Sequence, residues 1–100
     1  MRWILPLLLL AGCNFDVPLA SRCREVGVAV DHKDTVTGTI LAEYVGTLEQ
    51  VSRECGSPFK DKYGCAIGVL DHRYILWYVD DPNERDHERC HALYEEKKHT

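Results

Sequence analysis

Two histidines and a glutamate near the end of the chain have the types and spacing of a metal-dependent hydrolytic site. His87, Glu88 and His91 form an HExxH sequence. Residues four apart lie on one face of a helix, so His87 and His91 can direct both imidazoles at one Zn²⁺ ion. Glu88 is rotated about 100° from His87, which places a carboxylate where it can take a proton from water. The pattern predicts zinc ligation by the histidines and general-base catalysis by Glu88.

A catalytic zinc usually takes three protein ligands, and the candidates for the third are His99, Glu95 and His72. Glu95 lies on the same helix face, but two unbroken turns put it about 12 Å along the axis from His87. His72 is expected in a turn at the far end of its strand. His99 can reach the ion only if the helix ends near Tyr94 and the tail folds back, although no glycine or proline marks such an end. We rank His99 first, then Glu95, then His72.

The HExxH helix resembles the active-site helix of the zincin-type metallopeptidases. The resemblance rests on His87, Glu88 and His91, and the glycine and third histidine that follow in metzincins are absent. It implies Zn²⁺ as the cofactor and a peptide or protein as the substrate. Zincins also place a strand edge before the helix to bind extended substrate, and the segment Arg73–Val79 has that position in this chain.

The N terminus has the composition of an export signal. Arg2 is followed by an apolar run from Trp3 to Leu10. This run is far shorter than the roughly 20 residues that a membrane-spanning helix needs, so it predicts a secretion signal and not a membrane span. Directly behind it, the residues LAGC that end at Cys13 resemble the lipobox of bacterial lipoproteins. The resemblance implies that Cys13 is acylated and becomes the first residue of the mature chain.

The residue after Cys13 bears on where the lipoprotein resides. It is Asn14, not the aspartate that usually retains lipoproteins in the inner membrane. By this resemblance we expect the periplasmic face of the outer membrane. The expected organisation is a signal peptide at 1–12, a lipidated tether at 13–21 and a single domain at 22–100. The whole chain also resembles small bacterial and phage lipoproteins that end in such a helix.

Setting Cys13 aside leaves four cysteines, which are Cys23, Cys55, Cys65 and Cys90. An even number in a small exported domain predicts disulfides, and four cysteines allow three pairings, among which the sequence does not choose. Cys90 lies inside the HExxH sequence, yet in an oxidising compartment a disulfide is better motivated than metal ligation. The net charge of −4 and the mixed signs argue against a nucleic-acid binder, which would carry a basic patch.

Apolar spacing predicts the elements that must position these side chains. Apolar residues recur every three or four positions between Thr39 and Cys55, which predicts an amphipathic helix. The stretch Tyr63–Val79 alternates and is dense in β-formers, which predicts a β-hairpin with its turn at Asp71-His72. The second strand of this hairpin is apolar on both faces, so we expect it to be covered on both sides.

The HExxH sequence falls behind a strong helix start. Asp81 can cap the helix and Pro82 suits its first position, which predicts a helix from Pro82 to about Lys97. Upstream, Glu25–Val30 is rich in valine and predicts a strand or an extended lead-in. The expected fold class is α+β: a small single domain with an amphipathic helix, a β-hairpin and a C-terminal HExxH helix, as in a minimal zincin-like core.

These observations predict a lipid-anchored, zinc-dependent hydrolase of the cell envelope, with peptidase activity and membrane attachment through Cys13. The alternative is a non-catalytic, disulfide-stabilised envelope lipoprotein that binds a protein partner as an inhibitor, a lysis factor or an exclusion factor. In that case the aromatic residues Tyr74, Trp77 and Tyr78 are the candidate contact surface. A third option is a structural metal site without catalysis.

Overall fold

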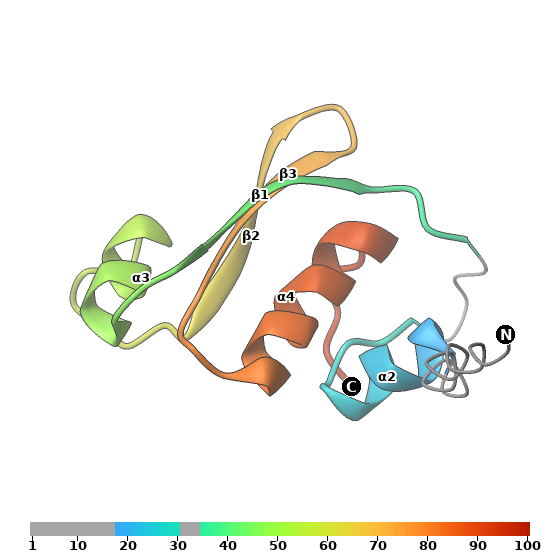
Figure 1. The fold of residues 1–100 in the computed structure, drawn as a ribbon, viewed down its shortest axis with the longest axis horizontal. Coiled ribbons are helices and arrows are strands. Elements are labelled where there is room, and N and C mark those ends of the chain that lie inside the picture. Colours follow the sequence, from blue (N-terminus) through green and yellow to red (C-terminus); the bar gives the residue numbers. More distant parts are fainter. Residues whose placement is uncertain (1–17, 31–34) are drawn as a thin grey trace, which may run out of the picture.

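The computed structural model describes residues 18–30 and 35–100. Within them the elements are α2 (Leu19–Glu25), β1 (Thr39–Val45), α3 (Leu48–Glu54), β2 (Gly64–Leu70), β3 (Arg73–Tyr78) and α4 (Pro82–Tyr94). They form a small α+β domain, so the expected fold class is confirmed (Figure 1). The predicted signal peptide and Cys13 lie outside the described residues. Positions 19–21, expected in the tether, are the first turn of α2, so the domain begins closer to Cys13 than expected.

The three strands form a mixed sheet in the order β1-β3-β2. The predicted hairpin is confirmed: β2 and β3 pair antiparallel, and His72 in the turn adopts a left-handed conformation with φ 57°. β1 pairs parallel with the other side of β3. The strand that precedes the HExxH helix is therefore central and not an edge, contrary to the expectation for Arg73–Val79. Among the described strands, the edges are β1 and β2.

The predicted helix from Thr39 to Cys55 is wrong over its first half. Thr39–Val45 is strand β1, and the helix α3 begins only at Leu48. Short apolar spacings fit either period, and here a partner distant in sequence decides: β1 pairs with β3 from Thr39 through Val45. The helix start is local, because the Thr47 hydroxyl accepts from the Gln50 N–H at 3.1 Å and the Gln50 side chain accepts from the Thr47 N–H at 3.0 Å.

Helix α4 lies in the middle of the domain. One of its sides packs on the sheet, and α2 packs on another side (Figure 1). The buried residues accordingly form two clusters, which are Leu76, Tyr78 and Ala92 towards the sheet, and Cys23, Val28, Val30, Cys90 and Tyr94 towards the N-terminal segment. On the far face of the sheet Trp77 stacks on Tyr44, which is 46 % exposed. Helix α4 thus covers one face of β3, and the far face keeps exposed apolar surface.

Two disulfides join elements that are separate in the sequence. Cys23–Cys90 links α2 to α4 across a sequence separation of 67, and Cys55–Cys65 links the end of α3 to β2 across a separation of 10. This is one of the three pairings that the cysteine count allows. Within the described residues no helix combines the length and apolarity needed to cross a bilayer.

Candidate metal centre

Helix α4 positions the first two histidines. Its start is the predicted one: the Asp81 carboxylate accepts from the Asn83 N–H at 2.9 Å, and Pro82 is the first helical residue. One turn apart on this helix, His87 and His91 bring their Nε2 atoms to 3.0 Å from each other. Both side chains are half-buried. The local sequence therefore places this pair as the HExxH spacing predicts.

The helix ends at Tyr94, a turn earlier than the expected end near Lys97. Glu95 adopts a left-handed conformation with φ 50°, and the Glu96 N–H donates back to the His91 carbonyl at 3.1 Å. This is the tight end that glycine usually provides. A glutamate occupies the position here, which is why the sequence shows no break.

The tail beyond this turn folds back along the N-terminal segment. The Ala29 N–H donates to the Lys98 carbonyl at 3.0 Å, and the Thr100 N–H donates to the Gly27 carbonyl at 2.9 Å. His99 lies between these two bonds, in an antiparallel bridge with Val28. The arrangement brings His99 Nε2 to 3.1 Å from His91 Nε2. The residue that we ranked first as third ligand thus joins the other two.

The three histidines form a cluster suited to one metal ion. One ligand nitrogen from each ring can be chosen so that all three lie within 4.8 Å of one another. The rings of His87 and His99 stack with centroids 5.2 Å apart, and the His91 ring stands edge-on to both. Tetrahedral zinc with Zn–N bonds of about 2.0–2.1 Å places its ligand nitrogens roughly 3.3 Å apart. The Nε2 separations of His91 from His87 and from His99, 3.0 and 3.1 Å, are close to that value.

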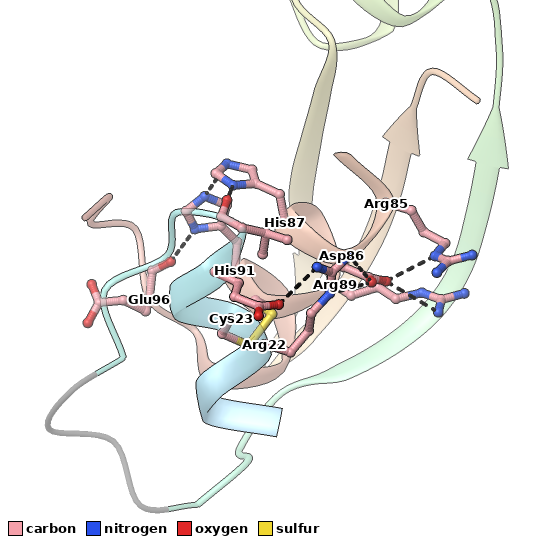
Figure 2. The surroundings of a disulfide bond; sticks show 11 residues. Arg22, Cys23, Arg85, Asp86, His87, Arg89, His91 and Glu96 are labelled. Carbon is pink, nitrogen blue, oxygen red and sulfur yellow. Dashed lines mark hydrogen bonds and ion pairs between the residues drawn. A yellow bond between two sulfur atoms is a disulfide. The ribbon is translucent and has the colours of Figure 1, made fainter. Parts of the chain in front are cut away.

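In two of the histidines, a hydrogen bond at Nδ1 determines which ring nitrogen carries the hydrogen. His87 Nδ1 lies 2.6 Å from the Val26 carbonyl oxygen. His91 Nδ1 lies 2.5 Å from the carbonyl oxygen of Glu96, and both of these residues are labelled in Figure 2. A carbonyl oxygen only accepts, so both Nδ1 atoms donate. Burial also lowers the pKa of His91, which favours its neutral ring.

Neutral rings with hydrogen on Nδ1 carry lone pairs on Nε2. The Nε2 atoms of His87 and His91 lie 3.0 Å apart. A cation between two such rings can accept one lone pair from each. Metal-bound histidines usually donate their other ring N–H to a carbonyl or a carboxylate, as these two do. The cluster can therefore hold a metal ion of the kind that imidazole binds.

Glu88 lies beside the cluster and is 5 % exposed. A carboxylate oxygen of Glu88, one of Glu84 and a ring nitrogen of His87 all lie within 4.8 Å of one another. Burial, together with a hydrogen bond to Glu84, raises the pKa of Glu88 to about 9. The HExxH spacing predicts Glu88 beside the histidines but gives no sign of Glu84, which precedes Glu88 by one helical turn and so lies on the same helix face.

The other two candidates for the third ligand are engaged elsewhere. The Glu95 carboxylate accepts hydrogen bonds from Tyr74, Thr37 and His72, each at 2.7 Å. These bonds lower the pKa of Glu95 to about 2, and the bond to Glu95 together with burial raises the pKa of Tyr74 to about 12. Glu95 and His72 thus brace the end of α4 and are not part of the histidine cluster.

A pocket of about 490 Å³ opens over the histidines and Glu88. One wall is the start of β2 with the residues before it, and the other is the C-terminal tail; the lining includes Asp61, Lys62, Tyr63, Gly64, Ala66, Glu96 and Lys97. Cys90 is bonded to Cys23 and does not enter the cluster as a ligand. The pocket leaves room for a substrate beside the candidate ligands.

Comparison of the chain with family models, with curated proteins and with solved structures found no match. Function is therefore inferred from the chemistry of the histidine cluster, from the carboxylates beside it and from the pocket above it.

Proposed function

We propose that the chain is a zinc-dependent hydrolase, a peptidase of the cell envelope held at the membrane by lipid on Cys13. One observation carries the proposal: the Nε2 atoms of His87, His91 and His99 converge, with separations of 3.0 and 3.1 Å. Three histidines with an open fourth position form the ligand set of a catalytic zinc and not of a closed structural site.

Zinc in such a site polarises a carbonyl and lowers the pKa of water. Glu88 takes the proton from the water that adds to the carbonyl carbon, and it passes that proton to the amine nitrogen as the C–N bond breaks. Glu84, hydrogen-bonded to Glu88, stabilises the protonated form between these two steps. A dication close to Glu88 favours the ionised carboxylate in the resting site, which the base role requires.

An edge strand in the wall of the pocket favours a peptide as the substrate. β2 is an edge strand, and its first residues together with those before it line the pocket. An extended peptide can add to such an edge through main-chain hydrogen bonds, which would place a peptide carbonyl near Glu88. The edge is supplied by β2 and not by the strand that directly precedes the helix.

Metal analysis of the purified, oxidised full chain tests the proposal. We expect one equivalent of zinc per chain, loss of most of it in His87→Ala, and cleavage of a mixture of unstructured peptides by the wild type. Glu88→Gln should keep the zinc and lose cleavage by at least a hundredfold, as for removal of a general base. Absence of stoichiometric zinc refutes the proposal. Bound zinc without cleavage by the wild type indicates the structural metal site instead.

The partner-binding alternative finds less support. Its candidate surface, Tyr74, Trp77 and Tyr78, is divided between the two faces of the sheet: Tyr74 and Tyr78 pack towards α4, and Trp77 stacks on Tyr44 on the far face. The half-exposed Tyr44–Trp77 pair is therefore the only part of this candidate surface that a partner protein could contact on the far face of the sheet. A wild-type chain that binds no zinc but captures an envelope protein through this pair would favour it.

A further inference from the structure

The segment 26–30 supports the histidine cluster at three points. The Val26 carbonyl accepts from His87 Nδ1 at 2.6 Å, which orients that ring. The Gly27 carbonyl and the Ala29 N–H bond the tail on either side of His99, at 2.9 and 3.0 Å. Two of the three candidate ligands are therefore held in place by one short stretch that is distant from both in sequence.

Apolar packing, a disulfide and an ion pair hold this segment on α4: Val28 and Val30 lie in the same buried cluster as Cys90 and Tyr94. The Val28 N–H donates to the Cys23 carbonyl at 2.9 Å, which ties the segment to the end of α2. Cys23 is bonded to Cys90, which lies between His87 and His91 in the sequence, and the sulfur-bearing residues are 0 and 1 % exposed. Arg22 adds an ion pair with Asp86 at 2.8 Å, away from the histidines in Figure 2, and a hydrogen bond to the Asn83 side chain at 3.1 Å. The Arg22 side chain is 31 % exposed, so water screens this pair and the covalent link is the stronger one.

The other disulfide has no such connection. Cys55–Cys65 joins the end of α3 to β2. Neither element carries one of the three histidines or a carbonyl that accepts from them. The chain therefore contains its own control, because one disulfide fastens the support of the histidines and the other fastens the β2 wall of the pocket, which carries none of the three histidines.

We propose that the Cys23–Cys90 disulfide positions His87 and His99, so that the affinity of the cluster for a divalent cation falls when this bond is absent or reduced. The inference rests on the metal binding proposed above and concerns what controls it. On reduction the S–S bond takes up two electrons and two protons to give two thiols, and a thiol or phosphine reductant is oxidised. The segment 26–30 then loses its covalent attachment to α4. Cys23 and Cys90 are positioning residues, acting through Val26 and the tail.

Paired serine variants test the inference without adding free thiols as ligands. The double variant Cys23→Ser/Cys90→Ser is compared with Cys55→Ser/Cys65→Ser, and zinc affinity is measured by competition with a chromophoric chelator. We expect a loss of tenfold or more in the first variant, the usual effect of removing groups that orient metal ligands, and a change of less than about twofold in the second. The visible spectrum of bound Co²⁺ should also change in the first variant only.

A second measurement uses the wild-type chain and does not depend on how the variants fold. Because both sulfurs of Cys23–Cys90 are buried, a phosphine reaches them only when the segment opens. Zinc that binds the closed cluster more tightly than the opened one lowers the opening equilibrium of the segment by the ratio of those two affinities. Saturating zinc should therefore slow phosphine reduction of Cys23–Cys90 by tenfold or more and leave Cys55–Cys65 within about twofold, as followed by alkylation and mass spectrometry.

The outcomes separate this inference from the proposed function. An oxidised wild type that takes up no zinc refutes both. Zinc binding that is equally strong in the wild type and in both serine variants, with no protection of Cys23–Cys90 by zinc, refutes only the role of the disulfide. Equal losses of affinity in the two variants would show a general effect of stability and would also overturn it.

Discussion

At the scale of single residues, the position of Glu88 depends on the absence of a side chain in the strand opposite. A Cβ on Gly64 would lie 2.7 Å from Glu84 Oε2 and 2.9 Å from Glu88 Cγ. Real Cβ atoms do not approach so closely, and Gly64 is itself buried. Gly64 therefore gives the two carboxylates room beside the start of β2, and any larger residue there has to displace them.

Replacing Gly64 tests the role of Glu88 without removing the glutamate. Gly64→Ala should leave zinc affinity close to that of the wild type, because the histidines are not displaced. It should lower kcat for peptide cleavage by at least tenfold, about 1.4 kcal/mol in the barrier, because the base moves. The matched control is Gly68→Ala on the same strand, whose Cβ would lie 3.5 Å from the Tyr74 ring, an ordinary contact. Equal kcat values in both variants would contradict the placement of the base.

At the scale of elements, the end of α4 decides whether a third histidine reaches the cluster. The helix stops because Glu95 turns into the left-handed conformation, and three hydrogen bonds hold its carboxylate. Two of the donors belong to the sheet side, Tyr74 on β3 and His72 in the β2–β3 turn. A residue that looked like a possible ligand thus ties the helix end to the sheet and sends the tail back.

The Glu95 brace should make stability depend on pH with a definite sign. The pKa of Glu95 is lowered to about 2 from an ordinary 4.5, so its contribution is present above about pH 4.5 and is lost as the pH falls towards 2. The pKa of His72 is raised from 6.5 by the bond to Glu95, so its share is complete below pH 6.5 and is lost at higher pH. The Tm difference between the metal-free wild type and Glu95→Gln should therefore be greatest between these limits.

The check is thermal unfolding of both chains from pH 2 to 8 with a chelator present. The difference in Tm should decrease as the pH falls below 4.5, and it should also decrease as the pH rises above 6.5. Glu54→Gln, at the exposed end of α3, serves as control and should show a small and constant difference. A difference between the wild type and Glu95→Gln that stays constant down to pH 2 would argue against the brace.

At the scale of the whole molecule, the candidate metal centre lies where the two ends of the described chain meet. The C-terminal tail runs beside the segment after α2, and α4 lies between them and the sheet (Figure 1). Because α2 begins at Leu19, the stretch from Cys13 can span at most about 20 Å when fully extended. A lipid on Cys13 would therefore hold the start of α2 within about 20 Å of the membrane surface, which favours substrates of the envelope.

Removing the acyl acceptor tests this arrangement. Cys13→Ser should shift the chain from the membrane fraction of a bacterial host to the soluble fraction of the exported material, since the variant lacks the thiol that the proposed acyl chains are attached to. Zinc content and cleavage of soluble peptides should be unchanged, because the variant leaves the domain intact. Asn14→Asp is the matched control and should remain in the membrane fraction. Membrane association of Cys13→Ser would refute the lipid anchor.

What could be predicted from the sequence were features that depend on neighbours within a few residues. The start of α4 follows from Asp81 and Pro82, the β2–β3 hairpin follows from β-formers on both sides of a two-residue turn, and the pairing of His87 with His91 follows from helical periodicity. The capping groups, the turn and the helical spacing are each completed by groups nearby in the sequence, so they can be recognised without the fold.

Only the tertiary structure decided the rest. β1 is a strand because β3, far away in sequence, offers a row of backbone partners. Cys23 meets Cys90 because α2 packs on α4, and His99 reaches the cluster because a glutamate, braced from the sheet, ends the helix. Each depends on contacts between segments that meet only when the chain is folded. The sequence by itself therefore determined two candidate ligands and a candidate base, and the tertiary contacts brought the third candidate ligand to them.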